Sequence, residues 1–107
     1  MDNILIVEDS KLINQALNSE FSQLGYNCFH CYSLKEANEI LNNNEIHYVL
    51  LDINLPDGNG YEIIVKLKDT FTKIFVLTGT TDKNFQEKMY EEGVLEFIIK
   101  DQNFFIK

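Results

Sequence analysis

The sequence predicts an α/β domain built on a doubly wound parallel sheet of five strands in the order 2-1-3-4-5. Apolar runs alternate with segments whose apolar residues recur at helical spacing, which is typical of a parallel sheet with right-handed crossovers. One run, Tyr48–Leu51, leads directly into Asp52 and is followed by a proline and two glycines. This run predicts a central strand that is buried on both faces.

The first strand is expected at Asn3–Val7, an apolar run that ends at Glu8 and Asp9. The period then changes, and a helix is expected between Ser10 and Gly25, because apolar residues recur every three or four positions and glycine is common just after a helix. The residues with this spacing are Leu12, Ile13, Ala16, Leu17, Phe21 and Leu24.

The next elements are a strand at Asn27–Tyr32 and a helix that begins with a capping box formed by Ser33 and Glu36. After the central strand, a third helix is expected between Gly60 and Asp69. The residues expected to face the core are Ala37, Ile40 and Leu41 in the second helix and Tyr61, Ile64, Val65 and Leu67 in the third.

The last two strands are expected at Lys73–Leu77 and Glu96–Ile99. Between them, Asp82 can cap a fourth helix that ends before Gly93. With these elements the alternation of strands and helices covers the whole chain, and we expect one domain without a linker.

Composition restricts the partners of this domain. Its 17 acidic and 9 basic residues give a net charge of −8, which would repel the phosphates of nucleic acids and anionic lipids. We therefore expect metal ions or proteins as partners, with no direct contact to nucleic acid or membrane. Because neither a signal peptide nor a membrane span is expected, a cytoplasmic location is predicted.

The two cysteines, Cys28 and Cys31, have the CxxC spacing of redox and zinc sites. They lie within a predicted strand, however, where residues three apart point to opposite faces, and no second pair of ligands exists in the sequence. We expect two free thiols.

The carboxyl ends of neighbouring parallel strands meet at one edge of a sheet, where sites of this architecture lie. The residues expected to converge there are Glu8, Asp9, Asp52, Thr78 and Lys100. Three carboxylates this close must either hold protons or bind a cation. Oxygen ligands, including the backbone carbonyl of Asn54, favour Mg²⁺ or Mn²⁺.

A lysine ammonium and a hydroxyl beside such a metal form a phosphoryl-binding arrangement. Asp52 can act as the nucleophile and become an aspartyl phosphate, while Lys100 neutralises the phosphoryl oxygens. Gly79 is expected to leave room for the incoming group. Each of these residues alone also has an ordinary structural explanation as a turn, capping or surface residue.

At these positions the chain resembles the receiver domain of two-component response regulators, of the chemotaxis-regulator type. The resemblance covers nearly the whole chain and implies a flavodoxin-like fold. Its motifs are the acidic pair Glu8-Asp9, the spacing Asp52-x-x-x-Pro56-x-x-x-Gly60, the pair Thr78-Gly79, and Lys100.

The resemblance implies that Asp52 accepts a phosphoryl group from a histidine kinase or a phosphotransfer protein. Asp9 and Asp52 would bind Mg²⁺, with Glu8 acting through water, and Thr78 and Lys100 would hold the phosphoryl oxygens. Such a domain is not an enzyme beyond its own phosphotransfer and dephosphorylation.

The resemblance also implies how phosphorylation would be passed on to other proteins. Thr78 would move toward the phosphate and the Phe97 ring would follow, which would change the surface of the fourth helix and fifth strand for an effector domain or target protein. The side chains of Asn54 and Thr80 would control the lifetime of the phosphoryl group.

Two features depart from this family. Asp101 follows Lys100 where the family usually has proline, and residues 101–107 are too few for the fifth helix. We therefore expect that residues 1–107 are a fragment without that helix and without any effector domain, with self-association as a secondary expectation.

Two alternatives remain open. One is a degenerate receiver that binds proteins without phosphorylation, which the complete set of site residues disfavours. The other is a metal-dependent nucleic-acid domain of the topoisomerase-primase type, which needs Asp-x-Asp where this chain has Asp52-Ile53-Asn54.

Overall fold

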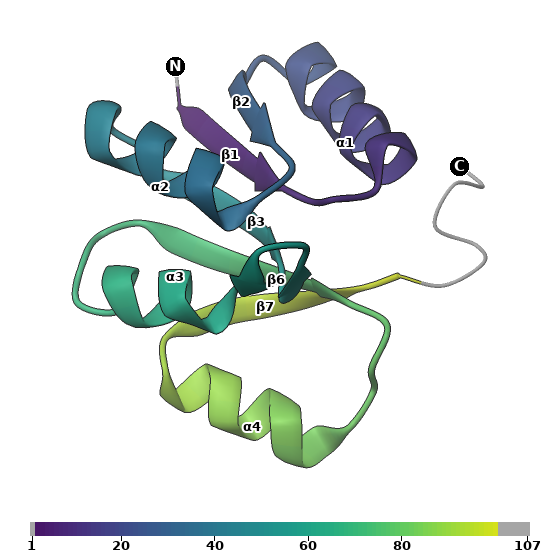
Figure 1. Cartoon of the computed structure of the whole chain (residues 1–107), viewed down its shortest axis with the longest axis vertical. Coiled ribbons are helices and arrows are strands. Elements are labelled where there is room, and N and C mark those ends of the chain that lie inside the picture. The colour runs from purple at the N-terminus through teal and green to yellow at the C-terminus, as the bar shows by residue number, and fades with distance from the viewer. Residues whose placement is uncertain (1, 101–107) are drawn as a thin grey trace.

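The computed structural model describes residues 2–100 of the chain. Its main sheet has five strands in the order β2-β1-β3-β6-β7, all paired in parallel, which confirms the predicted doubly wound order (Figure 1). In chain order the elements are β1 (Asn3–Val7), α1 (Lys11–Gln23), β2 (Asn27–Cys31), α2 (Leu34–Asn43), β3 (Tyr48–Asp52), β4 (Asn54–Leu55), β5 (Gly58–Asn59), α3 (Tyr61–Leu67), β6 (Lys73–Thr78), α4 (Lys83–Glu91) and β7 (Val94–Ile99).

Helices cover the two faces of the sheet unequally. On one face α1 packs through Leu17 on alternate side chains of the central strands, such as Ile6 and Leu50. On the other face α2, α3 and α4 cover a larger core, to which Leu51 and Ile64 belong. Because both faces are covered, the central strands are apolar throughout, as the run before Asp52 predicted.

The orientation of α3 differs from the prediction at one residue. Val65 was expected to face the core, but 51% of it is exposed, and Ile63 is fully buried instead. In an α-helix, residues two positions apart are separated by about 200° of rotation, so Ile63 and Val65 cannot share a face. The helix also ends at Leu67, earlier than the predicted end near Asp69.

The inner side of α1 contains a buried amide that the apolar pattern did not indicate. Asn14 is fully buried, whereas Leu12 and Leu24 are each 67% exposed. The Asn14 side-chain nitrogen donates to the backbone oxygens of Glu8, at 3.0 Å, and Cys31, at 2.8 Å. This side chain therefore joins α1 to the ends of β1 and β2.

The loop after Asp52 contains a short antiparallel hairpin, β4 and β5, where only a turn was expected. At its tip both carboxylate oxygens of Asp57 accept hydrogen bonds from the first backbone N–H groups of α2, at 2.8 Å from Leu34 and 3.0 Å from Lys35. The Ser33 hydroxyl caps the same helix by accepting from the N–H of Glu36 at 3.3 Å. The loop that follows Asp52 is thus attached to α2.

The two cysteines are free thiols, as expected. Cys31 is buried on the face of α2 to α4, and Cys28 packs on the face of α1. None of the helices within residues 2–100 has the length and apolar character needed to cross a membrane.

Candidate functional site

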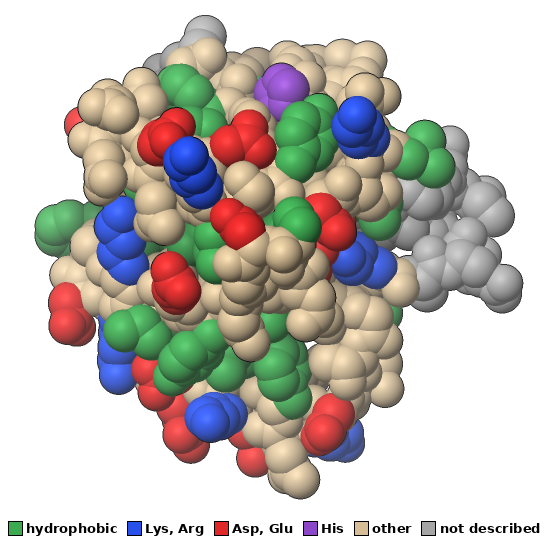
Figure 2. Space-filling view, in the orientation of Figure 1, with side chains coloured by type: hydrophobic (Ala, Val, Ile, Leu, Met, Phe, Trp, Pro, Cys, Tyr) green, Lys and Arg blue, Asp and Glu red, His purple; other side chains and the backbone are tan. Residues whose placement is uncertain are grey.

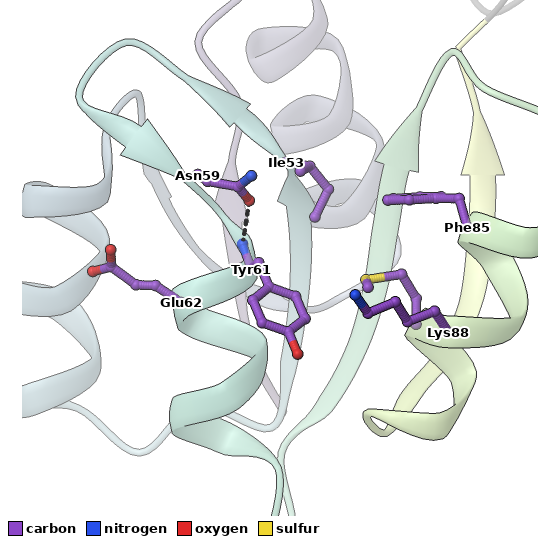
Figure 3. Close-up of a pocket in the computed structure, with 7 residues that line it drawn as sticks. Ile53, Asn59, Tyr61, Glu62, Phe85 and Lys88 are labelled. Carbon is purple, nitrogen blue, oxygen red and sulfur yellow. Dashed lines mark hydrogen bonds between the residues drawn. The ribbon is translucent and has the colours of Figure 1, made fainter.

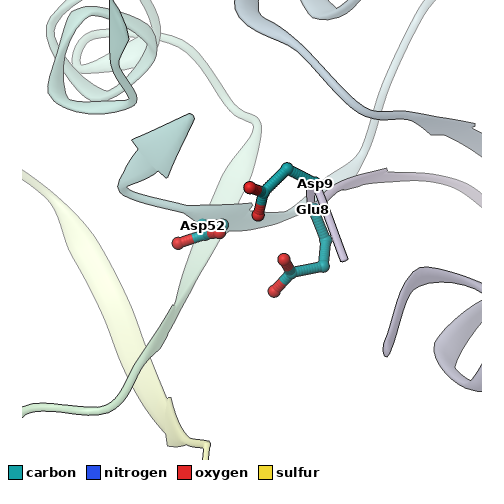
Figure 4. A group of neighbouring side chains, drawn as sticks. All are labelled: Glu8, Asp9 and Asp52. Atoms are coloured by element: carbon teal, nitrogen blue, oxygen red, sulfur yellow. The ribbon is translucent and has the colours of Figure 1, made fainter. Parts of the chain in front are cut away.

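Three carboxylates meet at the carboxyl ends of β1 and β3. Glu8 and Asp9 follow β1 directly and Asp52 ends β3, so the pairing of these strands places them side by side (Figure 4). One carboxylate oxygen from each residue lies within 4.8 Å of the others. Within residues 2–100 this is the only cluster of acidic, histidine or cysteine side chains with the spacing of a metal site.

Two of these carboxylates are buried, and one cation lies against them. Glu8 is fully buried and Asp52 is 5% exposed. The Lys100 ammonium, just after β7, lies 2.9 Å from Oε1 of Glu8 and 3.4 Å from Oδ2 of Asp52. The second Glu8 oxygen accepts the backbone N–H of Ser10 at 3.0 Å. The sequence prediction that Lys100 faces the acids is confirmed, although its shorter contact is to Glu8.

In the absence of a metal, the electrostatics of the cluster oppose the ionisation of Asp52. Burial, followed by the charge of Glu8, raises the pKa of Asp52 to about 7. For Lys100, burial lowers the pKa, but the hydrogen bond to Glu8 and the charges of both acids outweigh it and raise the pKa overall. Burial also opposes ionisation of Asp9, yet hydrogen bonding with Glu8 and Asp52 lowers its pKa.

Two predicted phosphoryl-binding residues, Thr78 at the end of β6 and Gly79 just after it, lie next to Lys100. The backbone oxygen of Thr78 accepts the N–H of Lys100 at 2.8 Å, which joins the ends of β6 and β7. The Thr78 hydroxyl accepts the N–H of Thr80 at 3.1 Å. A Cβ atom added at Gly79 would lie 3.8 Å from the Lys100 oxygen, an ordinary contact, so the protein alone does not require glycine there.

Two residues of the loop after β3 differ in how closely they are bound to the site. Asn54 is exposed, and its N–H donates to Oδ1 of Asp52 at 3.2 Å. Gly60 lies so close to β3 that an added Cβ atom would be 2.6 Å from the backbone oxygen of Asp52. The glycine at this motif position therefore has a structural reason, which is the close approach of two backbones.

Phe97 does not belong to the acidic cluster. It lies on β7, half-buried against α4, with its ring 6.1 Å from that of Phe85 and 5.1 Å from that of Tyr90. The Tyr90 hydroxyl in turn donates to Glu96 at 2.7 Å. The helical spacing of Phe85, Met89 and Tyr90 predicts that they share one side of the fourth helix, and in the structure the rings of Phe85 and Tyr90 both contact Phe97.

The donor set fits a hard divalent cation. Glu8, Asp9 and Asp52 offer carboxylate oxygens only, which suit Mg²⁺ and Mn²⁺ better than softer metals. Their mutual repulsion, offset in part by Lys100, would be relieved by a bound dication. The sequence departure at Asp101 and the predicted truncation over residues 101–107 lie outside the described residues.

This fold and this site define a class of α/β domains whose functional groups lie at the carboxyl ends of the central strands. The model of the response regulator receiver domain matches residues 4–104. The chain therefore belongs to the response regulator receiver domain family, as its motifs predicted. Receiver domains work in two-component systems with kinases and effector domains, as signalling domains rather than classical enzymes, and this family typically binds Mg²⁺ at an acidic pocket.

Two bacterial regulators that are similar in sequence to this chain are longer proteins. The chain is 34% identical over 99 residues to the TorCAD operon transcriptional regulatory protein TorR of Escherichia coli K12, and the match covers 92% of this chain and 43% of TorR. It is 32% identical over 102 residues to the aerobic respiration control protein ArcA of the same organism, and this match covers 94% of this chain and 43% of ArcA. The chain thus spans less than half the length of these relatives.

Solved structures show the same fold. The non-phosphorylated HemR receiver domain of Leptospira biflexa has a TM-score of 0.83 and 32% identity, with 94% of this chain and 82% of that chain covered. The chemotaxis protein CheY4 of Vibrio cholerae shares the fold, with a TM-score of 0.87 at 23% identity. The match covers 97% of this chain and 90% of the CheY4 chain. These comparisons give no support to the topoisomerase-primase alternative.

Proposed function

We propose that Asp52 accepts a phosphoryl group from a histidine kinase or a phosphotransfer protein. One observation carries this proposal: three carboxylates and a lysine ammonium from distant parts of the chain meet at the ends of β1, β3 and β7. Buried like charges are costly to fold, so a cluster of this kind suggests a functional role. The membership of the chain in the receiver family supports the same conclusion.

In the proposed reaction a carboxylate oxygen of Asp52 forms a bond to phosphorus while the bond from phosphorus to the donor imidazole nitrogen breaks. The electron pair of that bond returns to the imidazole, and Asp52 becomes an acyl phosphate. The Lys100 ammonium, 3.4 Å from Asp52, would balance negative charge on the phosphoryl oxygens, and the Thr78 hydroxyl and the Gly79 loop would bind them.

Glu8, Asp9, Asp52 and the backbone carbonyl of Asn54 would hold the Mg²⁺ or Mn²⁺ ion, with Glu8 acting through water. When bound, the cation supplies positive charge that offsets the charge gathered on the transferred group. Asp52 would be ionised more readily beside this cation, and its carboxylate is the form that attacks the phosphorus atom. A raised pKa of about 7 without metal makes this competition between proton and cation sensitive to pH.

The proposed switch consists of Thr78 and Phe97. The Thr78 hydroxyl would turn toward the phosphoryl group, and the Phe97 ring would change its packing against Phe85 and Tyr90 of α4. The phosphoryl group can shift this equilibrium only if it binds one of the two packings more tightly. Asn54 and Thr80, near the ends of β3 and β6, would then control how fast water removes the group.

We also propose that residues 1–107 form the receiver part of a longer protein. The relatives TorR and ArcA, of which the chain spans 43%, are named as a transcriptional regulator and a respiration control protein. On the face of α1 a cavity of about 150 Å³ is lined by apolar side chains, Phe21, Tyr26 and Phe75 among them. An added helix or a second copy of the chain could cover this face.

Extending the chain by about fifteen residues, enough for a typical helix, tests this second proposal. The extended chain is expected to melt at a higher temperature and to self-associate less in light scattering than residues 1–107. If residues 1–107 remain monomeric and the extension leaves the melting temperature unchanged, the proposal is wrong.

The phosphorylation proposal is tested with acetyl phosphate and Mg²⁺, followed by intact-protein mass spectrometry. We expect one added phosphoryl group on the parent and none on Asp52→Asn. Asp69→Asn, which changes an exposed aspartate outside the acidic cluster, is the matched control and should be labelled like the parent.

Equal labelling of Asp52→Asn and the parent would show that Asp52 is not the acceptor. A parent that is neither labelled nor able to bind beryllium fluoride with Mg²⁺ would favour the degenerate receiver, which binds partners without phosphorylation.

A further inference from the structure

A groove outside the acidic site separates α3 from α4. Figure 2 shows hydrophobic side chains gathered between these two helices, in the lower half of the view. The groove has a volume of about 490 Å³, which lies within the range of pockets that bind small molecules. The lining residues used below are Ile53, Tyr61, Glu62, Phe85, Lys88 and Met89.

The apolar walls of the groove are held in place by the surrounding structure. Met89 is 4% exposed and belongs to the main core. Phe85 packs edge-on against the ring of Phe97, with 6.1 Å between centroids. The backbone N–H of Tyr61 donates to the side chain of Asn59 at 2.8 Å. A ligand would therefore meet walls that need little ordering, which favours binding.

One cation extends into this groove. Figure 3 shows the Lys88 side chain reaching from α4 toward Tyr61, whereas Glu62 points to the other side of α3. Within the described residues the Lys88 ammonium has neither a hydrogen bond nor an ion pair, and it lies beside the apolar surface of Ile53 and Met89. The groove thus combines an apolar body with a single unpaired positive charge.

We propose that this groove binds a small organic anion, namely an aromatic carboxylate. An aromatic ring would pack between Tyr61 and Phe85, where edge-to-face contacts with both rings are available. Its carboxylate would accept a charge-assisted hydrogen bond from Lys88. Lys88 is exposed, so its ammonium stays hydrated beside a neutral ring, whereas a carboxylate adds a charge-assisted hydrogen bond and is the better match. The acids of the candidate site do not line the groove, so the inference does not depend on phosphorylation.

The experiment titrates the isotopically labelled chain with naphthalene-2-carboxylate and, as a neutral control, naphthalene-2-carboxamide, and it follows backbone amide resonances. A fragment of this size is expected to bind with a dissociation constant on the order of 1 mM. The largest shifts should occur at Ile53, Tyr61 and Met89. Loss of one partly exposed ion pair predicts that the carboxamide binds about fivefold more weakly.

Two lysine variants make the test specific. Lys88→Met keeps most of the apolar stem and removes the charge, so it should bind the carboxylate about fivefold more weakly than the parent, with no preference over the carboxamide. Lys83→Met, on the same helix but outside the groove, should bind like the parent. The proposal is overturned if no saturable shifts occur at the groove, if they concentrate at the cavity beside α1, or if Lys88→Met retains the preference.

Discussion

Leu51 and Asp52 are neighbours on β3 but belong to regions that affect stability in opposite ways. Leu51 is fully buried in the apolar core, and its burial stabilises the fold by roughly 2 kcal/mol. Asp52 is nearly as buried, at 5% exposed, but its neighbours are two carboxylates and a lysine. Burial and the charge of Glu8 oppose its ionisation and raise its pKa to about 7. The core stabilises the fold, whereas the acidic edge reduces stability in return for a reactive site.

The largest effect on stability is expected in the core. Ile63→Ala removes a fully buried side chain from α3 and should lower the free energy of unfolding by about 3 kcal/mol. Val65→Ala, on the same helix but 51% exposed, is the matched control and should change it by less than about 0.5 kcal/mol. Urea unfolding at fixed pH measures both. Equal losses would show that the assignment of the buried face of α3 is wrong.

Lys100→Ala is expected to affect the acidic edge more than the core. Without this ammonium, Asp52 and Glu8 lose their cation, and binding of beryllium fluoride with Mg²⁺ should weaken by about tenfold. Intrinsic fluorescence or amide resonances can follow the titration. Lys83→Ala, at the start of α4, is the control and should bind like the parent. An unchanged affinity in Lys100→Ala would show that Lys100 is only a structural partner of Glu8.

Asp52→Asn is expected to remove function and to increase stability. The amide retains the shape of the side chain but removes one of the buried negative charges, so the metal-free variant should be more stable than the parent at pH 8 by about 1 kcal/mol. Urea unfolding with a chelator present measures this difference. A variant less stable than the parent would mean that the ion pair with Lys100 outweighs the repulsion from Glu8 and Asp9.

The stability difference between these two proteins should also depend on pH. The folded-state pKa of Asp52, about 7, is above its ordinary value of 3.8, so folding favours the protonated form. Between these two values the unfolded chain binds fewer protons, and the contribution of Asp52 to stability is therefore lost as pH rises toward 7. The gap between Asp52→Asn and the parent should be small at pH 5 and larger at pH 8. A gap that does not change over this range contradicts the raised pKa.

The smallest effect is expected at the hairpin that follows the site. Asp57→Ala removes the carboxylate that accepts from the N–H groups of Leu34 and Lys35. Hydrogen exchange at the first turn of α2 should become faster, while the global loss of stability stays below that of Ile63→Ala. Asp69→Ala, at another exposed aspartate, is the control. Unchanged exchange in α2 would mean that Ser33 alone caps this helix.

The strand order, and the meeting of acidic side chains and a lysine at one edge of the sheet, could be predicted from the sequence. Apolar runs that end in Glu8, Asp52 and Lys100 are enough to place these residues together, because parallel strands in this order share one carboxyl edge. The free state of the two cysteines also followed from alternation along a strand. These features depend on local periodicity, which a sequence contains.

The contacts that those residues make depend on how the chain packs in three dimensions. The choice of Ile63 over Val65, and of Asn14 over Leu12, depends on the rotation of each helix against the sheet, which adjacent apolar residues leave open. The attachment of Asp57 to α2 joins residues 23 positions apart, and the ion pair of Lys100 with Glu8 joins residues 92 positions apart. The raised pKa of Asp52 follows from burial and from the nearby charge of Glu8. Burial and distance between remote residues exist only once the chain has folded, so no local pattern could supply them.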